Sequence, residues 1–284
     1  MRSFQEVSIK SIRDYWDARP CNINHSQKPV GEHEYYLEVR QRKYFVEPHI
    51  PDFANFSAWS GKRVLEVGCG IGTASLCFAE AGAEVTAVDL SPRSLEVARQ
   101  GARALGLEDR IKLIQCNAEK LSTSLPQGSF DLVYSFGVLH HTPNPDIALT
   151  EIRKLVKPDG VLKLMVYYRY SWKVFWILVG YGKGKFWEAD ELVARFSEAQ
   201  TGCPVTYTFT RSSARAWVEH HGFTIEDIFV DHIFPYRIPD YIEYRYMKNW
   251  YFRWLPKSVF HVFEKIFGWH LMITLKTTPE ANVK

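Results

Sequence analysis

Apolar runs and helical spacings alternate through the middle of the chain. An apolar run over 63–67 ends in a glycine-rich turn, and residues 73–81 follow with helical spacing up to Gly82. This alternation continues as far as residue 167. It predicts strands over 63–67, 84–88, 111–116, 130–135 and 161–167. Strands that alternate with helices indicate a parallel sheet covered by helices on both faces.

The alternation stops after Tyr167 and resumes at Thr210. A helix is then predicted over 212–221, a sixth strand over 223–230 and a last strand over 269–276. We therefore expect an α/β fold with a doubly wound, mostly parallel seven-stranded sheet, similar to the Rossmann arrangement.

Two interruptions of the pattern, at about 167–209 and 234–268, contain much of the aromatic content. Residues 167–187 include nine Phe, Tyr or Trp and residues 234–270 include thirteen, out of 42 in the chain. Both follow the carboxyl end of a strand, where open α/β sheets bind ligands, so both are expected to fold over that edge as a lid. We expect one domain over 61–284 with these two cap insertions, preceded by a helical cap segment over 1–60.

Three interpretations of the aromatic insertions stay open. The residues can form the core of the cap, or line an apolar acceptor pocket. The third interpretation is contact with a membrane surface, which the glycines at 180, 182 and 184 make less favoured. The residues concerned are Trp172, Phe175 and Trp176 together with Lys173, Lys183 and Lys185.

Composition narrows the class of protein. The 284 residues are 46% hydrophobic and 24% charged, which is ordinary for a globular chain, and the net charge of +3 does not indicate a nucleic-acid partner. Five scattered cysteines show no zinc-ligand spacing, and no apolar run approaches the ~20 residues of a membrane span. We expect a cytoplasmic protein with free thiols and no metal site; the oligomeric state is not predicted.

The glycine turn is the first candidate for chemistry. Gly68, Gly70 and Gly72 follow a predicted strand and precede a helix, and Asp89 ends the next strand. Glycines let the backbone approach a ligand closely, and an acid at the end of the second strand can accept the hydroxyls of a ribose. The pattern predicts a cofactor that contains a nucleoside. The GxGxG spacing disfavours a nicotinamide dinucleotide as the cofactor, but it does not exclude one.

Five ordered motifs resemble those of class I S-adenosylmethionine-dependent methyltransferases, most closely the small-molecule and ubiquinone/menaquinone branch. They are the segments 66–72, 88–91, 117–119, 130–141 and 155–160. The resemblance covers about residues 60–166, with looser similarity at 210–231 and 269–276. It implies S-adenosylmethionine as methyl donor, S-adenosylhomocysteine as product, and a small organic acceptor whose accepting atom is undefined.

The resemblance also implies a role for individual positions. Gly68, Gly70 and Gly72 belong to the turn around the methionine part, and Glu66 acts toward the ammonium group. Further cofactor contacts are implied for Asp89 (ribose), Leu90 and Ala118 (adenine), Asn117 (adenine edge, where the family usually has Asp) and Ser135 (ammonium, through its carbonyl).

Two positions are less firmly implied. Tyr15, or its neighbour Trp16, is expected to close the cofactor side from the N-terminal segment. His140 is the candidate general base, with loop ordering as the alternative. Methyl transfer needs alignment and exclusion of water more than it needs a base, because the sulfonium donor is already activated.

Other functions remain as alternatives. They are a lipid-linked or quinone-type acceptor, a module that binds S-adenosylmethionine without methylation, and a nicotinamide-dependent oxidoreductase. An RNA or protein methyltransferase is disfavoured by the low charge and by Ser135-Phe136-Gly137, which stands where base N-methyltransferases have an Asn/Asp-Pro-Pro-Tyr motif.

Overall fold

A single twisted sheet organises the part of the chain that the computed structural model describes, residues 4–183, 186–197 and 202–278. Within these residues seven strands pair in the order β3-β2-β1-β4-β5-β7-β6. They are β1 Arg63–Val67, β2 Glu84–Asp89, β3 Ile111–Gln115, β4 Phe130–Phe136, β5 Val156–Tyr167, β6 Phe223–Asp231 and β7 His270–Thr277. Only β7 is antiparallel to its neighbours β5 and β6, so the predicted doubly wound, mostly parallel sheet is confirmed.

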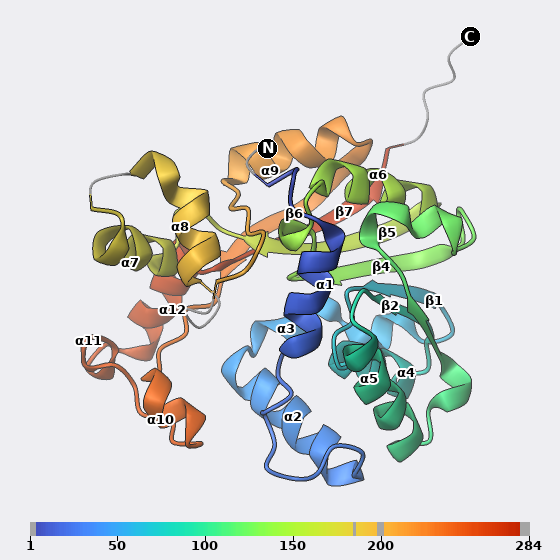
Figure 1. Ribbon diagram of the computed structural model, residues 1–284, viewed down its shortest axis with the longest axis horizontal. Coiled ribbons are helices and arrows are strands. Elements are labelled where there is room, and N and C mark those ends of the chain that lie inside the picture. The colour runs from blue at the N-terminus through green and yellow to red at the C-terminus, as the bar shows by residue number, and fades with distance from the viewer. Residues whose placement is uncertain (1–3, 184–185, 198–201, 279–284) are drawn as a thin grey trace.

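The central strands are buried because helices cover both faces of the sheet. Helices α4 (Thr73–Glu80) and α5 (Pro92–Ala104) lie on one face, and α6 (Pro145–Leu155) and α9 (Arg211–His220) lie on the other (Figure 1). Each face has its own apolar core. Four of the five residues of β1 are buried, as expected for a parallel strand between two helical layers.

The fifth strand begins earlier than the pattern predicts. Val156 pairs with Phe130 and Val161 pairs with Leu132, so residues 157–160 bulge out between two paired positions. Pro158 cannot donate to the ladder, which is consistent with an irregularity here. The remaining strands begin and end within one residue of their predicted positions.

The N-terminal segment forms α1 (Ile9–Ala18), α2 (His33–Val46), α3 (His49–Ala54) and a short 3-10 helix, η1 (Phe56–Trp59). Asp17 attaches α1 to the start of α5, because its Oδ1 accepts hydrogen bonds from Ser91 Oγ at 2.8 Å and from the Arg93 N–H at 2.9 Å. Figure 1 shows α1 crossing in front of the sheet edge. Short 3-10 helices η2 (Glu108–Arg110), η3 (Ala118–Thr123) and η4 (Leu139–His141) complete the connections of the sheet.

The two aromatic insertions fold as helices that pack on each other. The first contains α7 (Trp172–Tyr181), η5 (Phe186–Glu188) and α8 (Ala189–Phe196); the second contains α10 (Ile238–Ile242), α11 (Trp250–Arg253) and α12 (Lys257–Phe267). The Trp172 ring lies 5.3 Å from that of Phe263 and 6.0 Å from that of Phe252, which joins the insertions. They form an aromatic cap at one end of the sheet (Figure 1).

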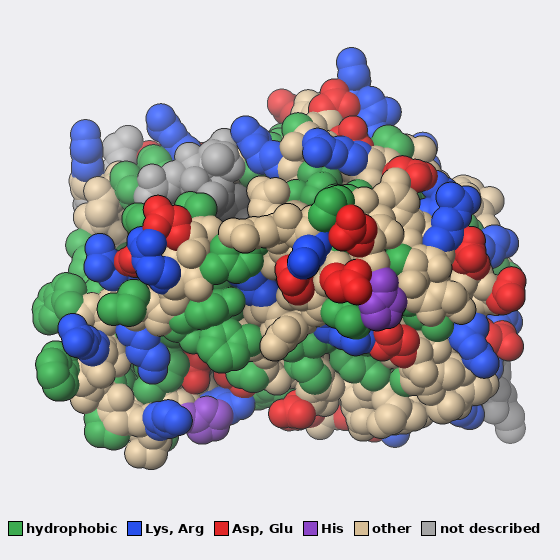
Figure 2. Space-filling model, turned by 90° about the horizontal axis from the view of Figure 1, so that it is seen from below, with side chains coloured by type: hydrophobic (Ala, Val, Ile, Leu, Met, Phe, Trp, Pro, Cys, Tyr) green, Lys and Arg blue, Asp and Glu red, His purple; other side chains and the backbone are tan. Residues whose placement is uncertain are grey.

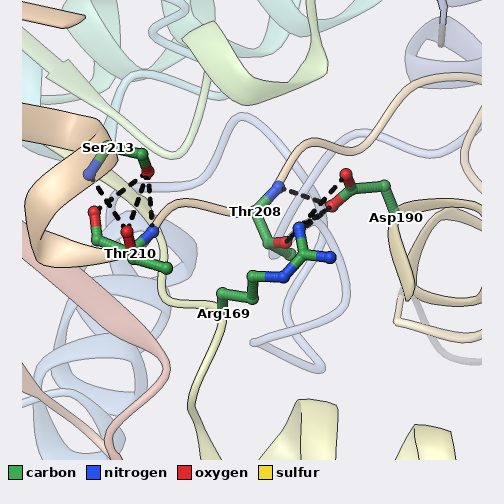
Figure 3. Close-up of polar contacts among 5 residues, drawn as sticks. All are labelled: Arg169, Asp190, Thr208, Thr210 and Ser213. Carbon is green, nitrogen blue, oxygen red and sulfur yellow. Dashed lines mark hydrogen bonds and ion pairs between the residues drawn. The ribbon is translucent and has the colours of Figure 1, made fainter. Parts of the chain in front are cut away.

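Polar contacts fix the first insertion to the sheet. Asp190 of α8 accepts hydrogen bonds from Thr208 Oγ1 at 2.6 Å and from Arg169 Nη1 at 3.4 Å, and all three side chains converge in Figure 3. Nearby, Thr210 and Ser213 form a capping box at the start of α9. Residues on both sides of the insertion are therefore tied to α8.

Candidate active site

A pocket opens at the carboxyl ends of β1, β2 and β4, where the strand order reverses. Open α/β sheets bind ligands at this switch point. Its walls come from the glycine turn after β1, the end of β2, the start of η3, the loop after β4, and helices α1 and α2. Among the described residues of the two aromatic insertions, none lines this pocket. The N-terminal helices, which were also expected to contribute to the cap, cover this pocket.

The glycine turn brings the backbone to the pocket floor. Gly68 and Gly70 line the pocket with φ values of 76° and 53°, a left-handed region that favours glycine. A Cβ atom on Gly68 would lie 2.2 Å from Val138 Cγ2, whereas one on Gly70 would meet nothing within 4 Å. Gly68 therefore allows the loop after β4 to approach, and Gly70 leaves open space on the ligand side. Gly72 caps α4 and does not line the pocket.

Asp89 faces the turn from the end of β2. Its Oδ2 accepts the Gly70 N–H and its Oδ1 accepts the Ser91 N–H, both at 2.8 Å. Each carboxylate oxygen retains a lone pair for a ligand hydroxyl. Burial raises the pKa of Asp89, while the backbone donors of Ser91, Gly70 and Leu90 act against that shift. The arrangement suits a diol such as a ribose.

Glu66 is a buried carboxyl group at the other end of the pocket. It is 5% exposed, and burial raises its pKa to about 7, although a hydrogen bond from Ser75 opposes the shift. Beside it on β4, Tyr134 also lines the pocket, and its buried hydroxyl has no hydrogen-bond partner among the described residues. The Glu66 carboxyl group can accept a hydrogen bond from a bound cation, and the unpaired Tyr134 hydroxyl is a second polar group beside it.

The segments after β2 and β3 form the third side of the pocket. Leu90 follows β2, Asn117 and Ala118 follow β3, and all three line the pocket. The Asn117 Oδ1 accepts the Glu119 N–H at 3.0 Å and so caps η3, which leaves its amide N–H groups for a ligand. An Asp at this position could make the same cap but has no such donor.

Helix α1 closes the pocket with Trp16 rather than with Tyr15. Trp16 lines the pocket, and its ring lies 5.1 Å from that of His141 in an edge-on contact. Tyr15 is not among the lining residues; its ring meets Trp16 at 5.0 Å and lies under the Arg19 guanidinium. Tyr15 thus supports Trp16 from outside.

Ser135 and His140 lie behind the pocket wall. Ser135 is fully buried and its Oγ donates to the Val67 carbonyl at 3.4 Å. His140 is also fully buried; both ring nitrogens lack hydrogen-bond partners among the described residues, and burial holds its pKa well below 6.5. The ring lies 3.8 Å from that of Tyr167. His141, which lines the pocket, is nearer to a ligand than His140.

Lys43 and Phe136 are pocket residues that sequence reasoning did not single out. Lys43 comes from α2, and its Nζ lies 6.0 Å from the centre of the Phe136 ring. Lys43 belongs to no recognisable motif. A lysine on a helix of mixed polarity usually faces solvent, so the pattern offered no reason to place it in a pocket. Phe136 stands beside a recognised motif, directly after Ser135, and that adjacency was the available signal.

Known proteins resemble the segment that builds this pocket. Residues 65–164 match the family model described as a methyltransferase domain. The match covers about a third of the chain and includes the glycine turn, Asp89 and Asn117. A ubiquinone biosynthesis O-methyltransferase of Haemophilus ducreyi is 41% identical over 114 residues, which are 37% of this chain and 44% of that protein. The chain thus spans less than half the length of the curated relatives it matches.

Solved structures resemble this chain over nearly its whole length. A magnesium protoporphyrin IX methyltransferase from Synechocystis with bound S-adenosylhomocysteine is 14% identical, with a TM-score of 0.58, 95% of this chain and 100% of that one covered. A [4+2]-cyclase is 17% identical, with a TM-score of 0.56, 97% of this chain and 96% of that one covered. At these identities the likeness shows the fold.

Proposed function

We propose that this protein transfers a methyl group from S-adenosylmethionine to a small organic acceptor. The observation that carries the proposal is the pairing of Gly70 and Asp89 at the switch point, inside a segment that matches the methyltransferase domain family. The pocket fits such a donor because it combines a close backbone approach, a diol-binding carboxylate and a second buried carboxyl group, Glu66.

In this proposal the methionine part lies along Gly68 and Gly70, with Gly72 fixing the turn. Glu66 receives the ammonium group, and the Ser135 carbonyl contributes from the end of β4. Asp89 receives the two ribose hydroxyls through its remaining lone pairs. The buried position of Glu66 strengthens its attraction for a cation, because the local dielectric is low.

At the other end, Leu90 flanks the adenine and Ala118 contacts it through the backbone. The Asn117 amide donates to a ring nitrogen, since its oxygen already caps η3. Trp16, supported by Tyr15, covers the cofactor from the N-terminal side.

When bound, S-adenosylmethionine supplies an electrophilic methyl carbon on a sulfonium. The chain's own part is to hold that carbon in line with the acceptor and to exclude water. His140 stays a candidate general base. However, its side chain is enclosed and does not line the pocket, and burial lowers its pKa, so it is a weak base out of reach of a bound acceptor. His141 is the better-placed imidazole.

The simplest test measures donor binding and transfer together. Asp89→Ala should weaken S-adenosylhomocysteine binding by ~1–3 kcal/mol in calorimetry, because charged hydrogen bonds to the ribose are lost. Wild-type protein should transfer labelled methyl groups from S-adenosylmethionine into a metabolite extract, and NAD should not bind.

Asp159→Ala, at an exposed position in the β5 bulge, is the matched control and should behave as wild type. Equal S-adenosylhomocysteine affinity for Asp89→Ala and wild type would refute the ribose assignment. Tight binding without any labelled product would favour a module that holds the cofactor without methylation.

The aromatic cap favours an apolar, lipid-linked acceptor. Sixteen of the nineteen large hydrophobic side chains described as exposed lie between Tyr170 and Phe267. The two insertions, 167–209 and 234–268, contain eleven Lys or Arg and seven Asp or Glu, whereas the whole chain has 35 and 32. Figure 2 shows these hydrophobic side chains gathered among Lys and Arg at the end of the molecule formed by the cap.

Helix α12 illustrates this surface. None of its residues is buried, and Val259, Val262 and Ile266 are each at least half exposed. No helix among the described residues is both long enough and apolar enough to cross a bilayer. Apolar side chains beside cations match the interface of an anionic lipid layer, which we propose as the docking partner. Lys185, considered in this context, lies outside the described residues.

A further inference from the structure

Three ionisable groups from distant parts of the chain meet beside the pocket. Glu47 lies between α2 and α3, His232 follows β6, and His270 begins β7. One ligand atom of each residue lies within 4.8 Å of those of the other two. Because β7 is antiparallel, its first residue lies at the edge where β4, β5 and β6 end. The methyltransferase motifs include none of these residues.

A fourth residue orients the cluster. His270 Nδ1 is 2.9 Å from His49 Nε2, and His270 Nε2 is 3.7 Å from Glu47 Oε1. If His270 donates from Nδ1 to His49, the lone pair on Nε2 points toward Glu47. Metal-binding histidines are usually held in this way, with the second ring nitrogen bonded to a neighbouring group.

The two imidazoles of the cluster are enclosed, and the carboxyl group is half-buried. His232 is 7% exposed and His270 is 4% exposed. Imidazole nitrogens and a carboxylate oxygen are ordinary ligands of transition-metal ions, and here they come from three separate elements.

The backbone at His232 is strained. Its φ of 70° is unusual for a residue with a side chain. The Asp231 carboxylate accepts the His232 N–H at 2.7 Å, and the His232 carbonyl accepts the Trp269 N–H at 2.7 Å. Within the described part of the chain, neither ring nitrogen of His232 has a hydrogen-bond partner. A strained backbone that presents an unpaired imidazole to a carboxyl group is typical of functional sites.

We propose that Glu47, His232 and His270 bind a divalent transition-metal ion such as Zn²⁺. Two imidazoles and one carboxylate are a donor set that zinc and ferrous ions take, with a further position left for an oxygen ligand. Ligand atoms on one zinc ion are about 3.3 Å apart, so the three donors approach one another by on the order of 1 Å on binding. This proposal does not depend on methyl transfer.

The site is one aromatic ring away from the methyltransferase pocket. Phe136 lines the pocket, and its ring lies 5.3 Å from that of His270 and 6.4 Å from that of His49. An ion held here would therefore lie on the β5 side of β4, whereas the glycine turn and Asp89 lie on its β1 side. The oxygen ligand that completes its coordination is water or an oxygen of a bound small molecule.

Cobalt spectroscopy tests the site directly. Tag-free full-length protein, freed of metal with a chelator, is titrated with Co²⁺ and then with Zn²⁺. We expect one Co²⁺ per chain, visible ligand-field bands of a nitrogen- and oxygen-ligated ion, and loss of those bands when Zn²⁺ displaces it. His232→Asn and Glu47→Gln should each weaken Co²⁺ binding at least tenfold.

The variants are chosen to preserve the fold. Asn tolerates a positive φ, so His232→Asn keeps the backbone, and Glu47→Gln keeps the side-chain shape. His220→Asn, at an exposed position on α9, is the control and should bind Co²⁺ as wild type does. Absence of the bands in folded wild-type protein, or unchanged affinity in Glu47→Gln, would overturn the site and leave a hydrogen-bonded histidine cluster.

Discussion

Glu66 and Asp89 are two buried carboxyl groups in one pocket with different surroundings. Asp89 accepts two backbone N–H groups, whereas Glu66 is enclosed by Tyr134 and Ser75 and has a pKa of about 7. The first is a fixed hydrogen-bond acceptor. The second changes charge near neutral pH, and it does so next to the place proposed for an ammonium group.

Proton release should reveal that ammonium group. A cation bound beside Glu66 lowers its pKa, so binding of S-adenosylhomocysteine below about pH 7 releases a proton, and affinity rises with pH until the free carboxyl is ionised. Calorimetry in two buffers of different ionisation enthalpy measures this release. Glu66→Gln should abolish it, while Glu84→Gln, exposed at the start of β2, should retain it. Equal proton release in Glu66→Gln and wild type would contradict the assignment.

Sequence reasoning reached individual positions only where a motif fixed them. Gly70, Asp89 and Asn117 were found because each stands at the end of a strand in a recognised order. The proximity of Glu47, His232 and His270 was not predicted, because 184 residues lie between Glu47 and His232 in the sequence. Residues so far apart form no sequence motif. They come together only through the pairing of β7 with β5 and β6.

Elements outside the sheet decide whether the pocket is closed. Helix α1 supplies Trp16 to the pocket wall and is attached to α5 through Asp17. Hydrogen bonds to the Arg93 N–H and to Ser91 hold the pKa of Asp17 below its usual range. Asp17 thus adds a second acceptor at the start of α5, where backbone N–H groups lack helical partners.

Loss of this attachment should open the pocket. Asp17→Ala is expected to speed S-adenosylhomocysteine dissociation and to weaken binding by ~1 kcal/mol, because α1 no longer holds Trp16 in place. Stopped-flow fluorescence measures the dissociation rate. Asp14→Ala, on the same helix, is the control, because Asp14 is exposed and pairs with its neighbour Arg13. An unchanged dissociation rate in Asp17→Ala would show that α1 does not gate the pocket.

The sequence predicted the positions of the strands better than the packing of the two aromatic insertions. Strands β1 and β4 lie inside a parallel sheet, so burial on both faces makes them visible as apolar runs. The insertions were expected to cover the ligand edge, yet they pack on each other through Trp172 and Phe263. Their direction depends on which aromatic rings meet, and periodicity does not encode that choice.

The whole molecule is asymmetric in its surface. The cap exposes Trp250 (79%) and Trp254 (83%), while Ile147 on α6 is one of only three large hydrophobic side chains described as exposed outside it. Some charges of the cap are paired with one another, since Asp240 pairs with Arg237 and Arg245. Large exposed apolar side chains are therefore what distinguishes the cap, on the side away from α4 and α5 (Figure 1).

Vesicle binding tests this surface. The protein should sediment with phosphatidylcholine vesicles that contain phosphatidylglycerol, less with phosphatidylcholine alone, and less at high salt, because charge screening weakens the attraction. Replacing both Trp250 and Trp254 with Ala should reduce the bound fraction severalfold. Ile147→Ala should have no effect. Binding that is insensitive to the two tryptophans would move the docking surface elsewhere, and absence of binding would remove it.

The β6–β7 connection is closed at its base, since the Trp269 N–H bonds to the His232 carbonyl before α10, α11 and α12 begin and after they end. Beyond that closure the segment contacts the sheet again, since Lys265 Nζ donates to Asp231 Oδ2 at 2.6 Å at the end of β6. It also contacts α2, where the Arg42 guanidinium lies over the Tyr241 ring at 4.2 Å. A change of sequence within the segment is therefore transmitted both to the end of β6 and to the helix that supplies Lys43 to the pocket.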